Sequence, residues 1–162
     1  MQLYILDYDP TLAAQSLCDV HVRKMMMETM QLLQTHFAIH GYKHHWKPYN
    51  PNNRFRKSLE NRDTYLWVIK YLSELEKEFR HRFDDKVPRY RSKLWDDVPF
   101  HLIDELDLDN ISSDNFARSF NKHSIEIDDV VEAYRKYYHI KASEFKVPFE
   151  YTNRDKPEWL LN

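Results

Sequence analysis

The strongest hydrophobic pattern of the chain lies between Cys18 and His36. At about 100° per residue, two sets of side chains separate onto different faces of a helix. The apolar face contains Val22, Met25, Thr29, Leu32, Leu33 and His36, and the polar stripe contains His21, Lys24, Glu28, Gln31 and Thr35. The pattern predicts one long helix, or two in succession with a break near Asp19, from about Leu12 to His40.

Two later stretches repeat the helical spacing. Apolar residues across positions 65–83 predict a second long helix that starts near Leu59 or Asn61 and packs on the first. The same spacing across positions 127–138 predicts a third helix. The sequence therefore predicts a mainly α fold, a bundle of about three long helices.

The remaining segments carry turn residues or lack a sustained period. Residues 3–6 predict a short strand or extended segment, and residues 42–55, with two prolines and three asparagines, predict a polar loop. Residues 84–111 are expected to form a loop with short helical turns. Ser112 or Ser113 is expected to cap a brief helix that ends near Phe120, and the tail after residue 151 is expected to form an irregular strap.

Length and composition limit the protein classes. A chain of 162 residues with 42% hydrophobic content is long enough for one packed domain, which we expect to span residues 1–162. No apolar run approaches the roughly 18 to 20 residues of a membrane span, and no leader pattern is present, so a cytoplasmic location is expected. Cys18 is the only cysteine, which excludes an internal disulfide and agrees with a reducing compartment.

The net charge is −2, but the basic residues gather in the middle of the chain. Basic and aromatic side chains alternate there, a composition that can neutralise phosphates and stack on bases. The candidate nucleic-acid-binding residues are Arg54, Arg56, Lys57, Trp46, Tyr49 and Phe55. The alternative is a solvated charged surface, with the aromatic rings closing the core beneath the loop.

The polar stripe places a base, an ammonium and a carboxylate within about two helical turns. His21, Lys24 and Glu28 are side chains that carry out proton transfer and imine chemistry, so they are the candidate catalytic residues. The alternative is a solvated helix face with an i,i+4 Lys24–Glu28 pair, worth only about 0.2 to 0.5 kcal/mol.

Several familiar sites have no support in the sequence. One glycine leaves no phosphate-binding loop, dinucleotide fingerprint or nucleophile elbow. His36 and His40 have ligand spacing on a helix, but no neighbouring acidic residue or second cysteine completes a metal set. We therefore predict neither a metal nor a cofactor.

Several strings spread over nearly the whole chain carry a family resemblance. They are LDYDPTLAAQSLCDVHVRKMMMETMQLL, NPNNRFRKSLENRDTYLW, EKEFRHRF, AYRKYYHIK and TNRDKPEW. The chain resembles a family of small bacteriophage proteins related to pyrimidine-dimer DNA glycosylase, an all-α enzyme of similar length. The resemblance implies DNA repair by combined hydrolase and lyase chemistry, in an infected host cell.

Within that resemblance, Asp19, His21 and Glu28 match the enzyme's Asp-x-His and the catalytic glutamate seven positions after the histidine. The enzyme class attacks the sugar C1′ with an N-terminal amine after a base is flipped out, and the glutamate moves protons. This chain departs from the pattern because Gln2 follows Met1, so the methionine is expected to stay, and because Met27 replaces an arginine. The proline-arginine pair expected shortly after Glu28 is also absent, and Lys24 is an alternative amine.

The sequence thus favours an enzyme that processes a flipped-out or modified DNA base. Two alternatives stay open: a non-catalytic nucleic-acid-binding or host-interaction protein, and an enzyme that acts on a free nucleotide. DNA or a nucleotide is the expected partner in either enzymatic case, and no membrane is expected. The oligomeric state is not predicted.

Overall fold

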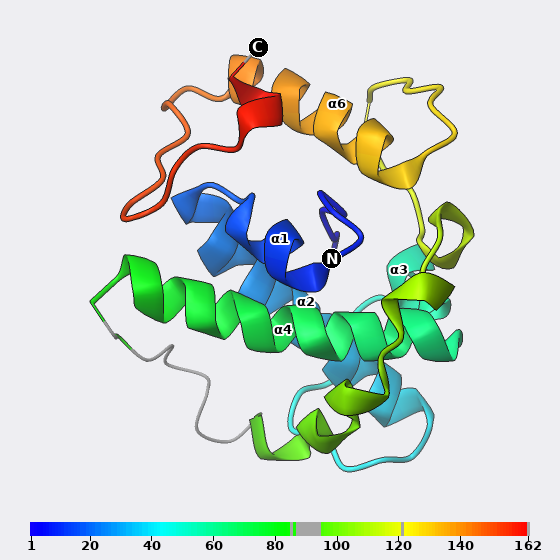
Figure 1. The fold of residues 1–162 in the computed structure, drawn as a ribbon. Helices are drawn as coiled ribbons and strands as arrows, with labels where there is room; N and C mark the ends of the chain where they lie inside the picture. Colours follow the sequence, from blue (N-terminus) through cyan, green and yellow to red (C-terminus); the bar gives the residue numbers. More distant parts are fainter. Residues whose placement is uncertain (85, 87–94, 121, 162) are drawn as a thin grey trace.

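The computed structural model describes residues 1–84, 86, 95–120 and 122–161 (Figure 1). Within these residues the regular structure is entirely helical, as predicted, and three of the helices are long. The α-helices are α1 (Pro10–Gln15), α2 (Asp19–Ile39), α3 (Arg54–Ser58), α4 (Arg62–Arg82) and α6 (Val130–Glu144). The short 3-10 helices are η1 (Trp95–Asp97), η2 (Phe100–Glu105), η3 (Leu108–Asn110), η4 (Ser113–Asn115) and η5 (Glu158–Leu160).

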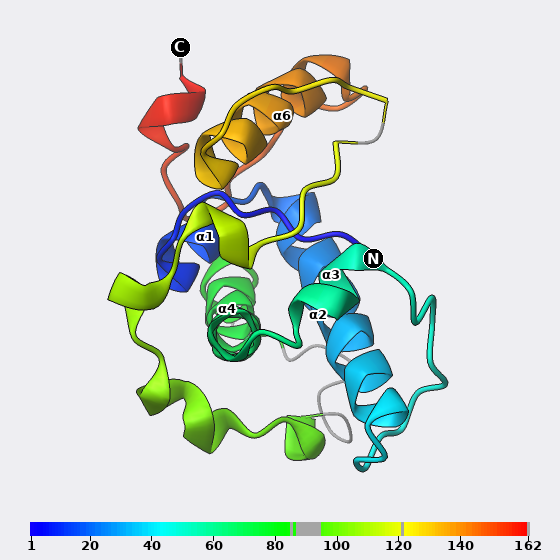
Figure 2. The ribbon, with the colours of Figure 1, turned by 90° about the vertical axis from the view of Figure 1, so that its right-hand side faces the viewer.

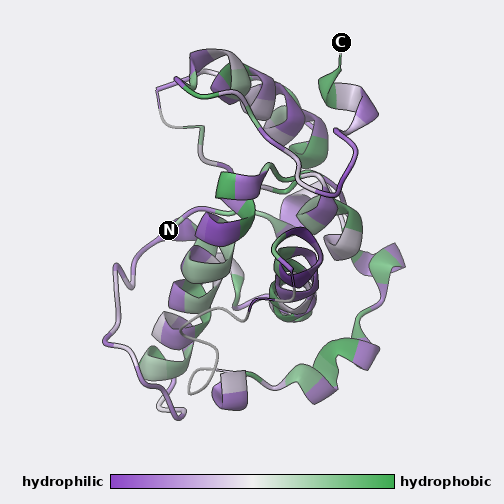
Figure 3. Cartoon of the chain, turned by 90° about the vertical axis from the view of Figure 1, so that its left-hand side faces the viewer, coloured by the Kyte–Doolittle hydropathy of each residue, from purple (hydrophilic) through white to green (hydrophobic). Residues whose placement is uncertain are grey.

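α4 is the centre of the arrangement, because α1, α2 and η2 all pack against it (Figures 1 and 2). α6 lies on the other side of the extended N-terminal segment, and the C-terminal η5 packs on α6. In Figure 3 the long helices carry hydrophilic and hydrophobic residues on different sides. This distribution is the reason that they associate as a bundle, since each apolar face must be covered by another element.

The break predicted near Asp19 is confirmed, and so is the apolar face of α2. Asp9 caps α1 by accepting the backbone N–H of Thr11 at 2.7 Å, and the chain resumes a helix at Asp19. All six residues predicted for the apolar face of α2 are at least 91% buried. The break lets α1 and α2 approach α4 as separate units.

The N-terminal segment is extended, as predicted, but it pairs with no strand among the described residues. Leu3, Tyr4, Ile5 and Leu6 are at most 1% exposed, and they thread between the helices as part of the core. Arg135 of α6 donates its Nε hydrogen bond to the carbonyl of Leu6 at 3.0 Å. Side-chain donors therefore satisfy backbone groups that a sheet would otherwise satisfy.

Two local predictions were wrong. The helix expected from Ser112 or Ser113 to Phe120 is only the single turn η4: Asn115 accepts the backbone N–H of Ser112 at 2.7 Å at its start, and the backbone is already extended at Phe116. Within the predicted loop of residues 42–55, the chain already enters α3, because Asn53 accepts the N–H of Phe55 at 2.9 Å and caps it. None of the described helices has the length and apolar content that crossing a bilayer requires.

Candidate functional site

Glu28 lies on α2 beside the start of the chain. Its Oε2 accepts the backbone N–H of Gln2 at 2.7 Å, and its Oε1 lies 3.5 Å from the Nζ of Lys24. The Glu28 side chain is 13% exposed, whereas that of Lys24 is 46% exposed. A carboxylate held in this way by a backbone donor and a cation has a defined orientation, which proton transfer requires.

Lys141 of α6 belongs to the same group. Burial lowers the pKa of its amine, the positive charge of Lys24 lowers that pKa further, and Glu144 and Glu28 oppose the shift. The Nζ of Lys141 lies 5.5 Å from the centroid of the Tyr137 ring. The charges of Lys24 and Glu28 on α2 therefore act on Lys141 of α6, and the lowered pKa shifts this amine toward its neutral, nucleophilic form.

Sequence reasoning did not select Lys141. The residue lies more than a hundred positions from Glu28, so no local spacing connects the two. One signal was present in the third predicted helix: Lys141 follows Tyr134, Tyr137 and Tyr138 by seven, four and three residues. That spacing places a lone ammonium on the buried face of α6, and an ammonium in such a place is a candidate for function.

The start of the chain is held over Glu28 by contacts from two other segments. Asn53, the residue that caps α3, donates from Nδ2 to the carbonyl oxygen of Met1 at 3.0 Å. Gln2 donates from Nε2 to the carbonyl oxygen of Ser119 at 2.8 Å. These contacts fix the Gln2 N–H that binds Glu28, and they bring the N-terminal segment, α2 and α3 together (Figure 2).

His21 lies beneath the surface and not beside the open side of Glu28. It is 3% exposed, its Nδ1 is 2.8 Å from the hydroxyl oxygen of Tyr138, and the rings of Phe145 and Phe149 pack on it. Burial, with a smaller effect of the Lys24 charge, lowers the pKa of His21 to about 3. The imidazole is therefore neutral near pH 7 and is held among aromatic side chains.

The polar stripe predicted on α2 is consequently shorter than the sequence suggested. Lys24 is exposed, and Glu28 and Gln31 are half-buried, but His21 and Thr35 are buried. Segments distant in the sequence cover these two residues: α6 and the chain after it cover His21, and the backbone of Tyr49 binds Thr35. A helical periodicity contains no information about such covering segments.

Cys18 lies within 3.3 Å of His21, measured from Sγ to Nδ1. Burial raises the pKa of the Cys18 thiol, and a hydrogen bond with Tyr138 opposes that shift only in part. The thiol is thus protonated near pH 7, unlike the thiolate that a nucleophilic cysteine requires.

Asp19, which the resemblance places in the enzyme's Asp-x-His, makes structural contacts. Its Oδ1 lies 3.0 Å from Nη1 of the buried Arg82, and its Oδ2 accepts the hydroxyl of Thr152 at 2.6 Å. Asp19 therefore joins the start of α2 to the end of α4 and to the C-terminal strap, and it sets the position from which His21 and Glu28 project.

The basic residues of α3 fall into two groups. Arg54 and Lys57 are exposed, and Arg54 donates from Nη1 to the carbonyl of Arg118 at 2.9 Å. Arg56 is only 7% exposed and is already paired with Glu60 and with the carbonyl of Pro51. Arg54 and Lys57 are thus the members available to a phosphate.

The three candidate stacking residues also differ. Phe55 is 2% exposed and belongs to the core, and the half-buried Trp46 packs against that core. Both agree with the alternative that these rings close the core beneath the loop. Tyr49 is 59% exposed and is the one of the three with an open ring face. The basic residues Arg89, Arg91 and Lys93 lie outside the described residues.

Comparison with protein-family models, curated proteins and solved structures gave no match to this chain. The family resemblance read from the sequence therefore remains an expectation.

Proposed function

We propose that this protein processes DNA bases by glycosylase and lyase chemistry at the surface around Glu28. The observation that carries the proposal is the grouping at Glu28, where α2, α6 and the extended N-terminal segment bring one oriented carboxylate together with Lys24 and Lys141. A primary amine beside a carboxylate is the minimal apparatus for an imine-forming reaction at a sugar carbon.

In the proposed reaction, the neutral Nζ of Lys141 attacks C1′ of a deoxyribose whose base is flipped out. The new N–C1′ bond forms as the glycosidic bond breaks, and the base leaves with the bonding electron pair and takes up a proton from water. Glu28 accepts a proton from the attacking amine and can return one to the sugar oxygen as the ring opens to the imine. Water then adds to C1′ and the C1′–N bond breaks, which frees the amine; alternatively, Glu28 removes a proton from C2′ and the C3′–O bond breaks, so that the 3′ phosphate leaves and the strand is cleaved.

The charges around this group suit an anionic polymer. Lys24 is exposed next to Glu28, and Arg54 and Lys57 are exposed on α3, whose capping residue Asn53 holds Met1 in place. Cations on two neighbouring elements can contact successive phosphates while the reacting sugar lies at the carboxylate. The resemblance to a pyrimidine-dimer DNA glycosylase supports the same substrate class.

The test is borohydride trapping, which reduces an imine to a stable adduct. The wild-type protein is incubated with duplexes that contain an abasic site or a pyrimidine dimer, and the modified peptide is identified by mass spectrometry. We expect an adduct on Lys141 that is lost in Lys141→Met and retained in Lys77→Met, a control at an exposed lysine of α4. An adduct on Lys24 or on the α-amine of Met1 would show that this amine is the nucleophile in place of Lys141, and imine formation would still be supported.

Binding to these duplexes without an adduct or strand cleavage would overturn the proposal. That result would favour the non-catalytic nucleic-acid-binding protein. Reaction with free nucleotides but not with duplexes would favour the nucleotide-processing enzyme.

A further inference from the structure

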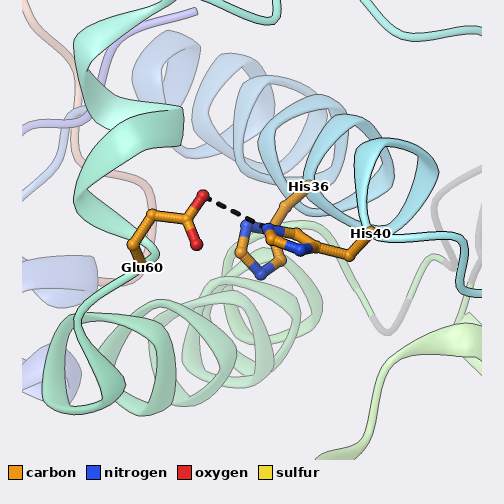
Figure 4. Close-up of side chains that lie close together, drawn as sticks. All are labelled: His36, His40 and Glu60. Carbon is orange, nitrogen blue, oxygen red and sulfur yellow. Dashed lines mark hydrogen bonds and ion pairs between the residues drawn. The ribbon is translucent and has the colours of Figure 1, made fainter.

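A second group of chemically active side chains lies at the opposite end of α2. His36 and His40 are one turn apart on this helix, and Glu60 approaches them from the turn between α3 and α4 (Figure 4). One nitrogen or oxygen atom of each residue lies within 4.8 Å of the other two. The sequence contained the two histidines at ligand spacing, but the acidic partner comes from twenty residues farther along the chain.

We propose that His36, His40 and Glu60 form a binding site for a divalent transition-metal ion of the Zn²⁺ type. The site is independent of the chemistry at Glu28. Two imidazole nitrogens and one carboxylate oxygen are the donor set of three-ligand zinc sites, whereas Mg²⁺ and Ca²⁺ prefer oxygen ligands alone.

The separations agree with one shared ion. The His40 Nε2 and the Glu60 Oε1 are 3.2 Å apart. Two ligands bound at roughly 2.0 to 2.2 Å in a tetrahedron lie about 3.3 to 3.6 Å from each other. The side chains of His40 and Glu60 are 38% and 50% exposed, so both can rotate by the small amount that closes the set around an ion.

His36 supplies a second, independent observation. It is 9% exposed, and within the described part of the chain its buried Nδ1 has no hydrogen-bond partner. Leaving a buried polar atom without a partner is unfavourable. Metal coordination through Nδ1 would fix the tautomer of His36 and give this buried nitrogen the partner that no described residue provides.

A cavity of about 400 Å³ borders the group. His36 lines it, together with aromatic and polar side chains that include Tyr42, Tyr65 and Asp97. A zinc site with three protein ligands keeps a fourth position for water or an exogenous ligand, and catalytic zinc sites have this form. The cavity beside His36 has space for such a ligand, and the ion would also join the end of α2 to the start of α4.

Arg56 is the neighbouring charge that must be considered. It contacts the Oε1 of Glu60, and its Nε donates to the carbonyl of Pro51 at 2.9 Å. This pairing holds the carboxylate toward the histidines, in the manner of the outer contacts that orient metal ligands. Its positive charge also weakens attraction for a dication, so we expect micromolar and not picomolar affinity.

The experiment is calorimetric titration of metal-free, tag-free protein with Zn²⁺ near neutral pH. We expect one ion per chain and a rise in the melting temperature with Zn²⁺ concentration. His40→Ala and the isosteric Glu60→Gln should each weaken binding at least tenfold. His101→Ala, which removes an exposed histidine of η2, should bind as the wild type does.

Circular dichroism establishes that each variant is folded before its affinity is compared. Equal Zn²⁺ affinity in the wild type, His40→Ala and Glu60→Gln would overturn the proposal. With Co²⁺ as a spectroscopic probe, added azide should shift the visible bands if the fourth position is open. Unchanged bands would show a closed site and overturn the assignment of an open position.

Discussion

Burial gives three residues of one helix three different chemical states. His21 is neutral because it is enclosed by aromatic rings, Glu28 is half-enclosed and held by a backbone N–H, and Lys24 extends into solvent. Their spacing on α2 places them on one side, but the segments that cover that side determine what each can do. Glu28 has both restricted solvent access and adjacent amines, so it is the residue whose change should affect chemistry most.

Glu28→Gln keeps the shape of the side chain and removes its proton-accepting charge. We expect a folded protein that binds abasic DNA as the wild type does, but forms the borohydride-trapped adduct about 10² times more slowly, the scale of general acid-base groups. Single-turnover trapping with saturating protein measures this rate. If Glu28 is only half of a surface pair with Lys24, the rate stays unchanged and stability falls by a few tenths of a kcal/mol.

The burial of His21 leads to a separate prediction about the free energy of unfolding at acidic pH. Its pKa is about 3 in the folded protein and about 6.5 when the chain is unfolded, so between these values only the unfolded chain binds the proton. The free energy of unfolding should therefore fall as the pH falls below about 6.5, by about 1.4 kcal/mol per pH unit from this residue.

Urea unfolding of the wild type and His21→Gln at pH values of about 7 and 5 tests this sign. The variant should show a smaller loss of stability on acidification, by roughly 2 kcal/mol over the interval. His36, whose pKa burial lowers to about 4, contributes equally to both proteins, so their difference isolates His21. An identical loss in both proteins would contradict the prediction.

At the scale of the elements, hydrophobic periodicity predicted the three long helices but missed the short α3 and the limited extent of η4. α2, α4 and α6 each bury several turns of apolar side chains, so their patterns are visible in the sequence. α3 has only five residues, and its start is set by one Asn53 cap and not by a pattern. The same limit applies to η4, a single turn whose start is set by hydrogen bonds from Ser112 to Asn115.

Arg54 and Lys57 of α3 are exposed to solvent, so we predict that they contact DNA. A double alanine variant at these positions should bind duplex DNA more weakly. Each lost phosphate contact lowers the slope of log affinity against log salt by about 0.9, so the double variant should lose nearly two units of slope. Fluorescence anisotropy across a salt titration measures both quantities.

Arg56 is left unchanged in this variant because its burial and its contact with Glu60 would confuse binding with folding. The matched control is the double alanine variant of Lys77 and Arg80, two basic residues at the other end of the bundle, on α4. An equal loss of slope in both variants would mean that α3 is not the contact surface.

At the scale of the whole molecule, both candidate sites depend on contacts between distant segments. Glu28 and Lys24 were selected from the sequence because they share one helix, whereas Lys141 and Glu60 were not selected as partners of these sites because they arrive from other elements. Such pairings depend on how the helices pack, and a single sequence shows the faces of a helix but not what covers them.

A buried charge network around Arg82 joins the end of α4 to other segments of the chain. This residue is 1% exposed, and it donates to the carboxylates of Glu78 and Asp19 and to the carbonyls of Leu17 and Gln15. Arg154 of the C-terminal strap binds the same Glu78 at 2.6 Å. The end of α4 thus holds the break between α1 and α2 on one side and the strap on the other.

Arg82→Lys keeps the charge of this residue but replaces a planar fork of five donors with three donors on one nitrogen. A single ammonium cannot reach all four acceptors, so at least one buried carboxylate or carbonyl loses its partner. Breaking a buried pair costs about 3–5 kcal/mol, and we expect a loss of this size in the free energy of unfolding measured in urea. The matched control is Arg80→Lys on the same helix, since Arg80 is partly exposed and pairs with Glu76 one turn away, an interaction worth at most about 1 kcal/mol. Amide hydrogen exchange should also rise in the strap around Thr152 and Arg154 in Arg82→Lys alone. If the two variants are equally stable, the Arg82 network does not hold the helices and the strap together.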